Sequence, residues 1–122
     1  MKYVFLAYQD EAQWNAMSTL ERDAFESACL ANEQDFRQSG HLLAVEGLQG
    51  SSTAITVWVT AGGKVSFTDG PFAETTGQLI RLFFINAIDL NEAICLASKM
   101  PQARMGSIEV RRTMDLDQPH GR

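Results

Sequence analysis

The sequence predicts a two-layer α+β domain, in which two helices cover one face of a largely antiparallel sheet. Three observations support this prediction: the expected elements follow the order β-α-β-β-β-β-α-β, both helix starts carry capping signals, and the first and fifth strands are apolar throughout. A chain of 122 residues is long enough to bury one core. We expect a single domain over residues 1–113 and a disordered polar tail over residues 114–122.

The first part of the chain predicts a strand followed by a long helix. Residues 2–8 (KYVFLAY) are apolar on both alternating sets of positions, and residues 9–17 form a polar connection. Ser18 and Glu21 have the spacing of a capping box, and Gly40 is placed to end the helix. The stripe expected in the core is Phe25, Ala28, Cys29 and Phe36, and the face expected in solvent carries Arg22, Asp23, Glu26 and Glu33.

The central region predicts three strands. Residues 41–48 (HLLAVEGL), 53–60 (TAITVWVT) and 64–68 (KVSFT) carry strand-forming patterns, and residues 61–63 form a hairpin turn between the last two. Along residues 53–60, alternation places Ile55, Val57 and Val59 on one face of the strand. Along residues 64–68, it places Val65 and Phe67 on one face, and Asp69 shares that face if the pleat continues.

The last part predicts a strand, a helix and a final strand. Residues 79–87 (LIRLFFINA) are apolar on both faces. Asp89 and Glu92 resemble a second capping box, and Pro101 stops the helix that they open. Residues 106–113 supply the final strand. The side chains expected in the core are Leu90, Ala93, Ile94 and Ala97 on the helix, and Ile108 and Val110 on the strand.

Strands that are apolar on both faces have a consequence for assembly. Two helices on one side of a sheet leave its other side bare, and such a patch exceeds what soluble monomers expose. We therefore expect a two-fold homodimer in which the sheets pack face to face.

Composition excludes several classes of partner. A net charge of −5 argues against nucleic acid or an anionic membrane. No signal-peptide pattern and no run of ~18 apolar residues is present, so we expect a cytoplasmic protein. Cys29 and Cys95 are expected to be reduced and buried, and nothing supports a disulfide between them. No metal-ligand cluster or phosphate-binding loop occurs, so neither a metal nor a tightly bound cofactor is expected.

The residues between the two central apolar regions form the most distinctive motif. Residues 69–75 read DGPFAET. Gly70 can take a positive φ, Pro71 fixes φ near −65°, and Asp69 can bond its own backbone, which is typical of a turn. Glu74 and Thr75 add a carboxylate and a hydroxyl just after it.

This run of seven residues, with Gln78 and Leu79 behind it, resembles the motif of the DGPF proteins in the YCII-related family. Residues 46–48 (EGL), 87–93 (AIDLNEA) and 107–111 (SIEVR) resemble flanking segments of the same family. The resemblance implies a ferredoxin-like fold that pairs into a dimeric α+β barrel. It leaves the activity undefined, although the family's genes often lie beside those of extracytoplasmic-function sigma factors.

The chain departs from the family pattern at three points. Residues 76–77 are Thr-Gly where the family usually has Lys-Glu, and residues 80–81 are Ile-Arg where paired glycines are frequent. Some wider relatives are thought to use a His/Asp pair with the histidine before the first helix. No histidine precedes His41 here, so that pair is not carried over.

The two carboxylates of the motif each have two interpretations. Asp69 would act as a general acid or base if it faces an enclosed interior, or it only caps the turn through backbone N–H groups. Glu74 would be the second carboxylate of a pair or the anchor of a cationic ligand, or it is an ordinary surface charge. The residues that would contact a ligand are Gly70, Pro71, Phe72, Thr75, Arg81 and Arg111.

The other candidates also keep two interpretations. His41 would titrate near neutrality as a free base, or it is a surface histidine at a strand end. Arg81 and Arg111 would bind a ligand carboxylate or neutralise the motif, or they form ordinary ion pairs. The aromatic residues that either line a pocket or pack in the core are Trp58, Phe67, Phe72, Phe83 and Phe84.

Two functions follow as hypotheses. The first is a homodimeric barrel that binds or transforms a small molecule by acid/base chemistry at the Asp69 motif, as a lyase, isomerase or hydrolase. The alternative is a non-catalytic ligand-binding or regulatory protein associated with sigma-factor systems, in which the motif is purely structural.

Overall fold

The computed structural model describes residues 1–70 and 77–116. Its strands are β1 (Lys2–Gln9), β2 (Leu42–Gly47), β3 (Ile55–Val59), β4 (Val65–Asp69), β5 (Gln78–Asn86) and β6 (Gly106–Arg112). Its helices are α1 (Glu11–Asn15), α2 (Thr19–Gln38), the short 3-10 helix η1 (Ser51–Thr53), α3 (Leu90–Ser98) and α4 (Gln102–Met105). The predicted order of strands and long helices is confirmed, and α1 and α4 are additions that the sequence reading took for connections.

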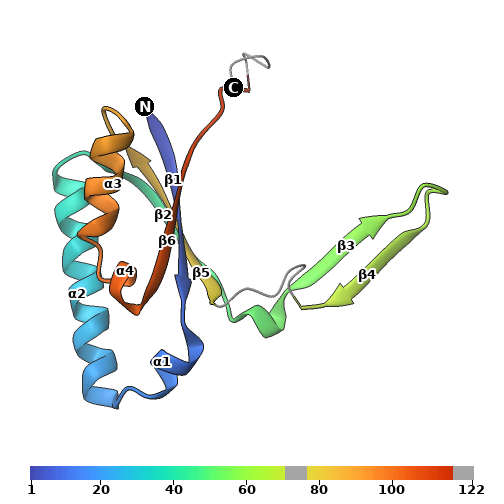
Figure 1. Ribbon diagram of the computed structural model, residues 1–122, viewed down its shortest axis with the longest axis horizontal. Coiled ribbons are helices and arrows are strands. Elements are labelled where there is room, and N and C mark those ends of the chain that lie inside the picture. Colours follow the sequence, from blue (N-terminus) through green and yellow to red (C-terminus); the bar gives the residue numbers. More distant parts are fainter. Residues whose placement is uncertain (71–76, 117–122) are drawn as a thin grey trace.

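Four strands form the main sheet in the order β2-β5-β1-β6, with every neighbouring pair antiparallel. At its centre Phe5 lies opposite Phe83 on one side and Val110 on the other. The two long helices, α2 and α3, lie together on one side of this sheet (Figure 1). Two interleaved strand–helix–strand units of this kind make a ferredoxin-like α+β fold, as predicted.

The core lies between the helices and the sheet. Alternate residues of β1 and β5 point toward the helices, so Phe5, Phe83 and Ile85 are almost completely buried. The residues that complete this cluster are Tyr3, Ala7, Phe36, Leu42, Ala87, Ala93, Leu96, Ala97 and Met100, with Ile108 and Val110 partly buried against it. The inward orientation predicted for the last two is confirmed.

Both predicted helix starts are capped by the residues that the sequence indicated. The Ser18 hydroxyl accepts from Glu21 N at 3.1 Å, and the Glu21 carboxylate accepts from Ser18 N at 3.0 Å. At α3, Asp89 accepts from Glu92 N at 2.9 Å, and the Glu92 carboxylate accepts from Ile88 N at 3.1 Å. These contacts satisfy N–H groups that have no partner inside the helix.

The helix faces are not quite those expected. On α2, Ala28 is exposed, whereas Glu33, predicted to lie in solvent, is buried beside Cys29 and Phe36. On α3, the buried residues are Ala93, Leu96 and Ala97, and the predicted core residues Leu90 and Ile94 are more than half exposed. Cys29 is buried and Cys95 is exposed, and both are free thiols.

The largest departure concerns the central hairpin. The six strands do not form one sheet, because within the described residues β3 and β4 pair only with each other. Figure 1 shows this hairpin, called the arm below, running away from the main sheet. Its register confirms the predicted faces, since Val57 lies opposite Phe67 and Ile55 opposite Asp69. The hairpin pairing of these two strands is confirmed, but the sequence did not predict that the pair would separate from the main sheet.

Of the helices in the described part of the chain, none has both the length and the apolar character needed to span a bilayer.

Candidate functional site

A cleft of about 660 Å³ opens between α1, α2 and the helix-facing side of the sheet. Its apolar lining includes Trp14, Phe25, Leu30, Leu48 and Ile80. Its polar and ionisable lining includes Gln9, Glu26, Cys29, Glu33, Arg81 and Gln102. An apolar wall with a few polar groups is the usual composition of small-molecule sites, so this cleft is the first candidate for a binding site.

An ion pair crosses the cleft. Arg81 Nη1 of β5 lies 2.8 Å from Glu33 Oε1 of α2, with the side chains 40% and 11% exposed respectively. Among the described residues, no other guanidinium nitrogen of Arg81 has a hydrogen-bond partner. A guanidinium carries five N–H donors, so Arg81 keeps donors for an acceptor group of a ligand while it neutralises Glu33.

Gln102 contributes an acceptor without a partner. It is the first residue of α4, follows Pro101, and is only 3% exposed. Within the described residues its Oε1 is buried and receives no hydrogen bond. Leaving such a group unsatisfied costs about 1–3 kcal/mol.

The aromatic wall of the cleft is held in place by neighbouring contacts. Trp14 and Phe25 meet edge to face, with ring centroids 6.0 Å apart. Arg22 lies over the Trp14 ring at 5.0 Å and donates from Nε and Nη2 to the Trp14 carbonyl at 3.2 and 3.0 Å. These contacts, including a cation–π contact, hold Trp14 in place in the wall of the cleft.

Cys29 lies on the same cleft. Burial raises the pKa of its thiol to about 11; the Arg81 charge opposes that rise, and the Glu33 and Glu26 charges add to it. The thiol is therefore protonated and unreactive near neutral pH. It serves better as a reporter of the cleft than as a nucleophile.

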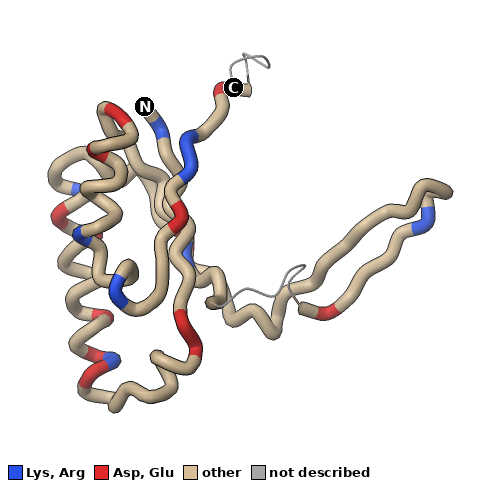
Figure 2. Tube along the Cα trace, in the orientation of Figure 1, with Lys and Arg blue, Asp and Glu red and all other residues tan. Residues whose placement is uncertain are grey.

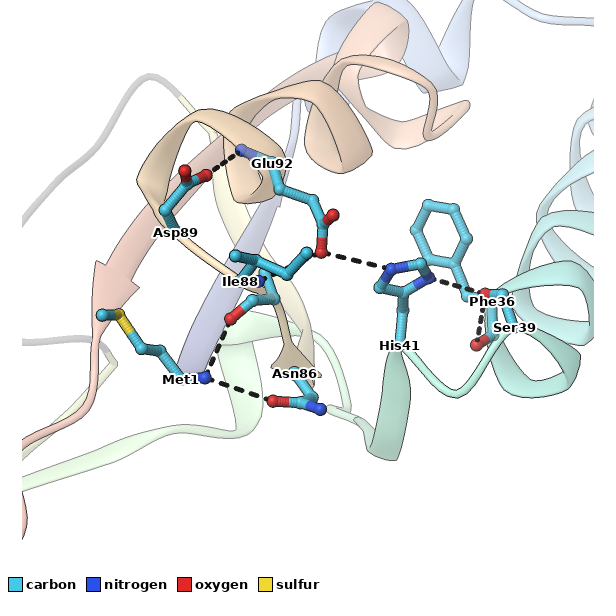
Figure 3. A network of polar contacts seen from close by, with 9 residues as sticks. Met1, Phe36, Ser39, His41, Asn86, Ile88, Asp89 and Glu92 are labelled. Carbon is cyan, nitrogen blue, oxygen red and sulfur yellow. Dashed lines mark hydrogen bonds and ion pairs between the residues drawn. The ribbon is translucent and has the colours of Figure 1, made fainter.

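A second polar cluster surrounds His41 (Figure 3). Ser39 Oγ lies 2.7 Å from His41 Nδ1, and His41 Nε2 lies 3.3 Å from Glu92 Oε1. The cluster joins the end of α2 to the start of α3 and borders a shallow cavity of about 290 Å³. His41 is therefore engaged in contacts that join two helices, and its role as a base stays a prediction.

The predicted motif residues lie elsewhere. Asp69 ends β4 on the exposed arm, and it is not among the residues that line either of the two cavities described above. Gly70 has φ of +99°, donates to Ala54 O at 2.6 Å and accepts from Thr56 Oγ1 at 2.9 Å, so the expected turn geometry is present at this residue. The four other predicted motif residues lie outside the described residues: Pro71, Phe72, Glu74 and Thr75.

The two arginines separate. Arg81 lies in the cleft, whereas Arg111 is on β6, 71% exposed, with Nε 3.9 Å from Glu109 Oε2. Neither makes an ion pair with Asp69 among the described residues. For Arg111 the contact is the ordinary surface pair that was one of its two interpretations.

The cleft also differs from the aromatic pocket considered from sequence. Phe83 is buried in the core, Phe84 lies on the side of the sheet away from the helices, and Trp58 and Phe67 are on the arm. Sequence reading missed Trp14, Glu33 and Gln102 as site residues. The one available signal was Asp10, which caps α1 by accepting from Gln13 N and so indicates a helix in the segment that contains Trp14.

Comparison with known proteins shows similarity to a family, to a relative and to a solved structure. A family model described as the YCII-related domain matches residues 1–117. An uncharacterised protein of Rhizobium meliloti is 34% identical over 113 residues, which cover 91% of this chain and 90% of that protein. Among solved structures, the chain resembles 5-chloro-2-hydroxyhydroquinone dehydrochlorinase from Burkholderia phenoliruptrix AC1100 in complex with 2,5-dihydroxybenzoquinone. The TM-score is 0.56 at 11% identity, over 97% of this chain and 98% of that one. A similarity at this level of identity concerns the fold.

Proposed function

Because the chain belongs to the YCII-related domain family, we propose that it binds a small hydroxylated organic molecule in the cleft between α2 and the sheet, and that this ligand is its substrate or effector. The observation that carries the proposal is Gln102, a residue of the same cleft as the Arg81–Glu33 pair, whose buried Oε1 has no partner among the described residues. A small rotation of this buried amide toward the cleft would let a ligand hydroxyl or N–H group satisfy the acceptor.

The size and lining of the cleft support this class of ligand. A volume of about 660 Å³ lies within the usual range of roughly 300–1,000 Å³ for small-molecule pockets. The rings of Trp14 and Phe25 provide an apolar wall against which a planar ring can pack. A hydroxylated ring in the cleft would lie among residues that include Gln102 and the donor Arg81. The structural neighbour's name describes an enzyme acting on such a ring, which supports the choice of ligands to test.

The cleft residues have distinct chemical roles in this proposal. Arg81 uses its remaining donors to hold an oxyanion or carboxylate of the ligand and to stabilise negative charge that develops there. Glu33, kept close to Arg81, accepts a hydrogen bond or a proton from a ligand hydroxyl. Gln102 orients the ligand through its carbonyl oxygen.

Acid/base chemistry at Asp69 is a second candidate function. One observation favours it: Asp69 lies on the apolar face of the arm, opposite Ile55, so a molecule that covered this face would remove the carboxyl from water. Desolvation of that kind raises a carboxyl pKa toward the range of a general acid or base. In this case ligand turnover would depend on Asp69, whereas binding in the cleft would not.

The proposal is tested by ligand binding to matched variants. We would titrate a panel of hydroxybenzoates against the wild type, Gln102→Leu and Gln38→Leu, with calorimetry as the readout; Gln38 is an exposed residue of α2. We expect Gln102→Leu to lose affinity by about tenfold or more and the Gln38 control to bind as the wild type does. Equal affinity in all three proteins, or no binding by the wild type, would contradict the proposal.

Catalysis is separated from binding by a further variant. If the Asp69→Asn variant binds a ligand normally but no longer converts it, this result would support the acid/base role of Asp69. Binding without conversion by the wild type would instead support the non-catalytic alternative.

A further inference from the structure

The charged residues that line the cleft do not balance. Glu26 and Glu33 of α2 contribute two carboxylates, and Arg81 of β5 contributes one guanidinium. Arg81 pairs with Glu33 at 2.8 Å, so Glu26 is left without a counterion in the described lining. The whole of α2 likewise carries more acidic than basic residues (Figure 2). A ligand that fills the cleft therefore meets an excess of negative charge.

Glu26 also lacks an ion-pair partner outside the cleft, among the residues that the structure describes. By helical spacing the nearest candidate is Arg22, one turn earlier on α2. Arg22 instead donates from Nε and Nη2 to the Trp14 carbonyl at 3.2 and 3.0 Å, and no ion pair of the described residues includes Glu26. Glu26 is exposed, so its carboxylate can bind a cation without breaking an existing pair.

The thiol of Cys29 responds to all three charges of the cleft. Burial is the main cause of its raised pKa; the Arg81 charge lowers that pKa, and the Glu33 and Glu26 charges raise it. Charges shift a pKa in this way only when they lie within electrostatic reach of the group. Glu26 and the Arg81–Glu33 pair therefore act on the same space, although they are separate groups.

The spacing along α2 sets the shape of a ligand that uses both groups. Glu26 and Glu33 are seven positions apart, which is two helical turns, so they share one face of α2 and lie about 10 Å apart along its axis. Leu30 lies between them in the cleft lining, and the rings of Trp14 and Phe25 supply the aromatic wall. A ligand that spans this distance needs a polar group at one end, a ring in the middle and a cation at the other end.

We propose that the cleft selects ligands in which a hydroxylated ring carries a protonated amine on a short chain, and that Glu26 pairs with this amine. The inference rests on the proposed function and narrows its class of ligand to hydroxyphenyl-alkylammonium ions. The ring hydroxyl then lies beside Arg81, and the ammonium lies at Glu26. An ion pair at an exposed carboxylate contributes little energy, so Glu26 sets the preference among ring ligands, while the ring itself supplies most of the affinity.

The test compares two ligands that differ in a single group. Tyrosol carries a hydroxyl where tyramine carries an ammonium, and the two share the same hydroxylated ring and the same short chain. We would measure the affinity of both for the wild type and for Glu26→Gln by calorimetry at low ionic strength, where charge pairs are screened least. We expect tyramine to bind the wild type about threefold or more tightly than tyrosol, and Glu26→Gln to remove this preference.

Asp35→Asn is the matched control and should keep the preference for tyramine, because Asp35 is an exposed residue of α2 outside the cleft lining. Slower alkylation of Cys29 reports that a ligand occupies the cleft. Equal affinities for two ligands that both protect Cys29 would overturn the preference for a cation and leave the ligand site intact. If neither ligand binds, or neither protects Cys29, the ligand site fails and this inference fails with it. An equal loss of preference in Asp35→Asn and Glu26→Gln would overturn the role of Glu26.

Discussion

Glu33 Oε1 lies 2.8 Å from Nη1 of Arg81, and this single contact joins the middle of α2 to β5 across the cleft. It explains why Glu33 is buried although its helix position suggested solvent. A carboxylate that loses water needs a partner, and Arg81 reaches it from a strand 48 positions further along the chain.

Removing Arg81 should therefore destabilise the fold. Arg81→Met leaves the Glu33 carboxylate mostly desolvated and unpaired. Because Arg81 itself is 40% exposed, we expect a loss of about 1–3 kcal/mol in the free energy of unfolding, measured by urea denaturation. The control Arg111→Met, on an exposed arginine, should stay within about 0.5 kcal/mol of the wild type. Equal free energies of unfolding for the two variants would show that the Arg81–Glu33 pair contributes nothing to stability.

Gln102→Leu should have the opposite effect on stability. The substitution removes a buried acceptor that has no partner among the described residues and keeps a side chain of similar size. We expect the unliganded protein to gain about 1 kcal/mol in free energy of unfolding, although it loses ligand affinity. A clear loss of stability would mean that the Gln102 amide supports the fold, and would remove the main support for the ligand site.

The capping box at α2 predicts a pH-dependent contribution. Hydrogen bonds from the Ser18 backbone and then from its side chain lower the pKa of Glu21 below its usual 4.5. A lowered folded-state pKa adds stability above the usual value, and this stability is lost as the pH falls through the lowered one. The effect of Glu21→Ala on thermal stability should therefore be present at pH 7 and fade as the pH falls below the usual 4.5 and through the lowered pKa.

Ser18→Ala is the companion experiment. It removes the hydroxyl that accepts from Glu21 N and should cost about 1 kcal/mol at neutral pH. A Glu21→Ala effect that stayed constant over the whole pH range would contradict the role of the carboxylate in the cap.

The parts of this fold that sequence could predict are local ones. The capping pairs Ser18–Glu21 and Asp89–Glu92 lie within one helical turn, so their geometry follows from spacing alone. Strand alternation likewise predicted that Ile55 and Asp69 each lie on an apolar face of their own strand. Such signals indicate an element without stating its partner.

The parts that sequence could not predict depend on distant partners. The arm separates from the sheet because β5 pairs with β1 and β2 instead of β4, and no local pattern distinguishes these pairings. Glu33 became a site residue only through Arg81, and Gln102 only because the chain after Pro101 buries it beside the cleft. Asp69, the strongest candidate from the motif, is exposed in the single chain, and its catalytic role stays a prediction.

The central claim is that ligands occupy the cleft, and the protection of Cys29 tests it most directly. Its thiol, with a pKa of about 11, lines the cleft, while Cys95 is exposed and lies outside the cleft residues. We would follow alkylation of both cysteines at about pH 9 by peptide mass spectrometry, with and without a bound hydroxybenzoate; the rate at Cys29 rises with pH as its thiolate forms. The account predicts that the ligand slows alkylation of Cys29 at least several-fold and leaves the alkylation rate of Cys95 unchanged. A ligand that binds the protein and leaves the Cys29 rate unaltered would contradict it.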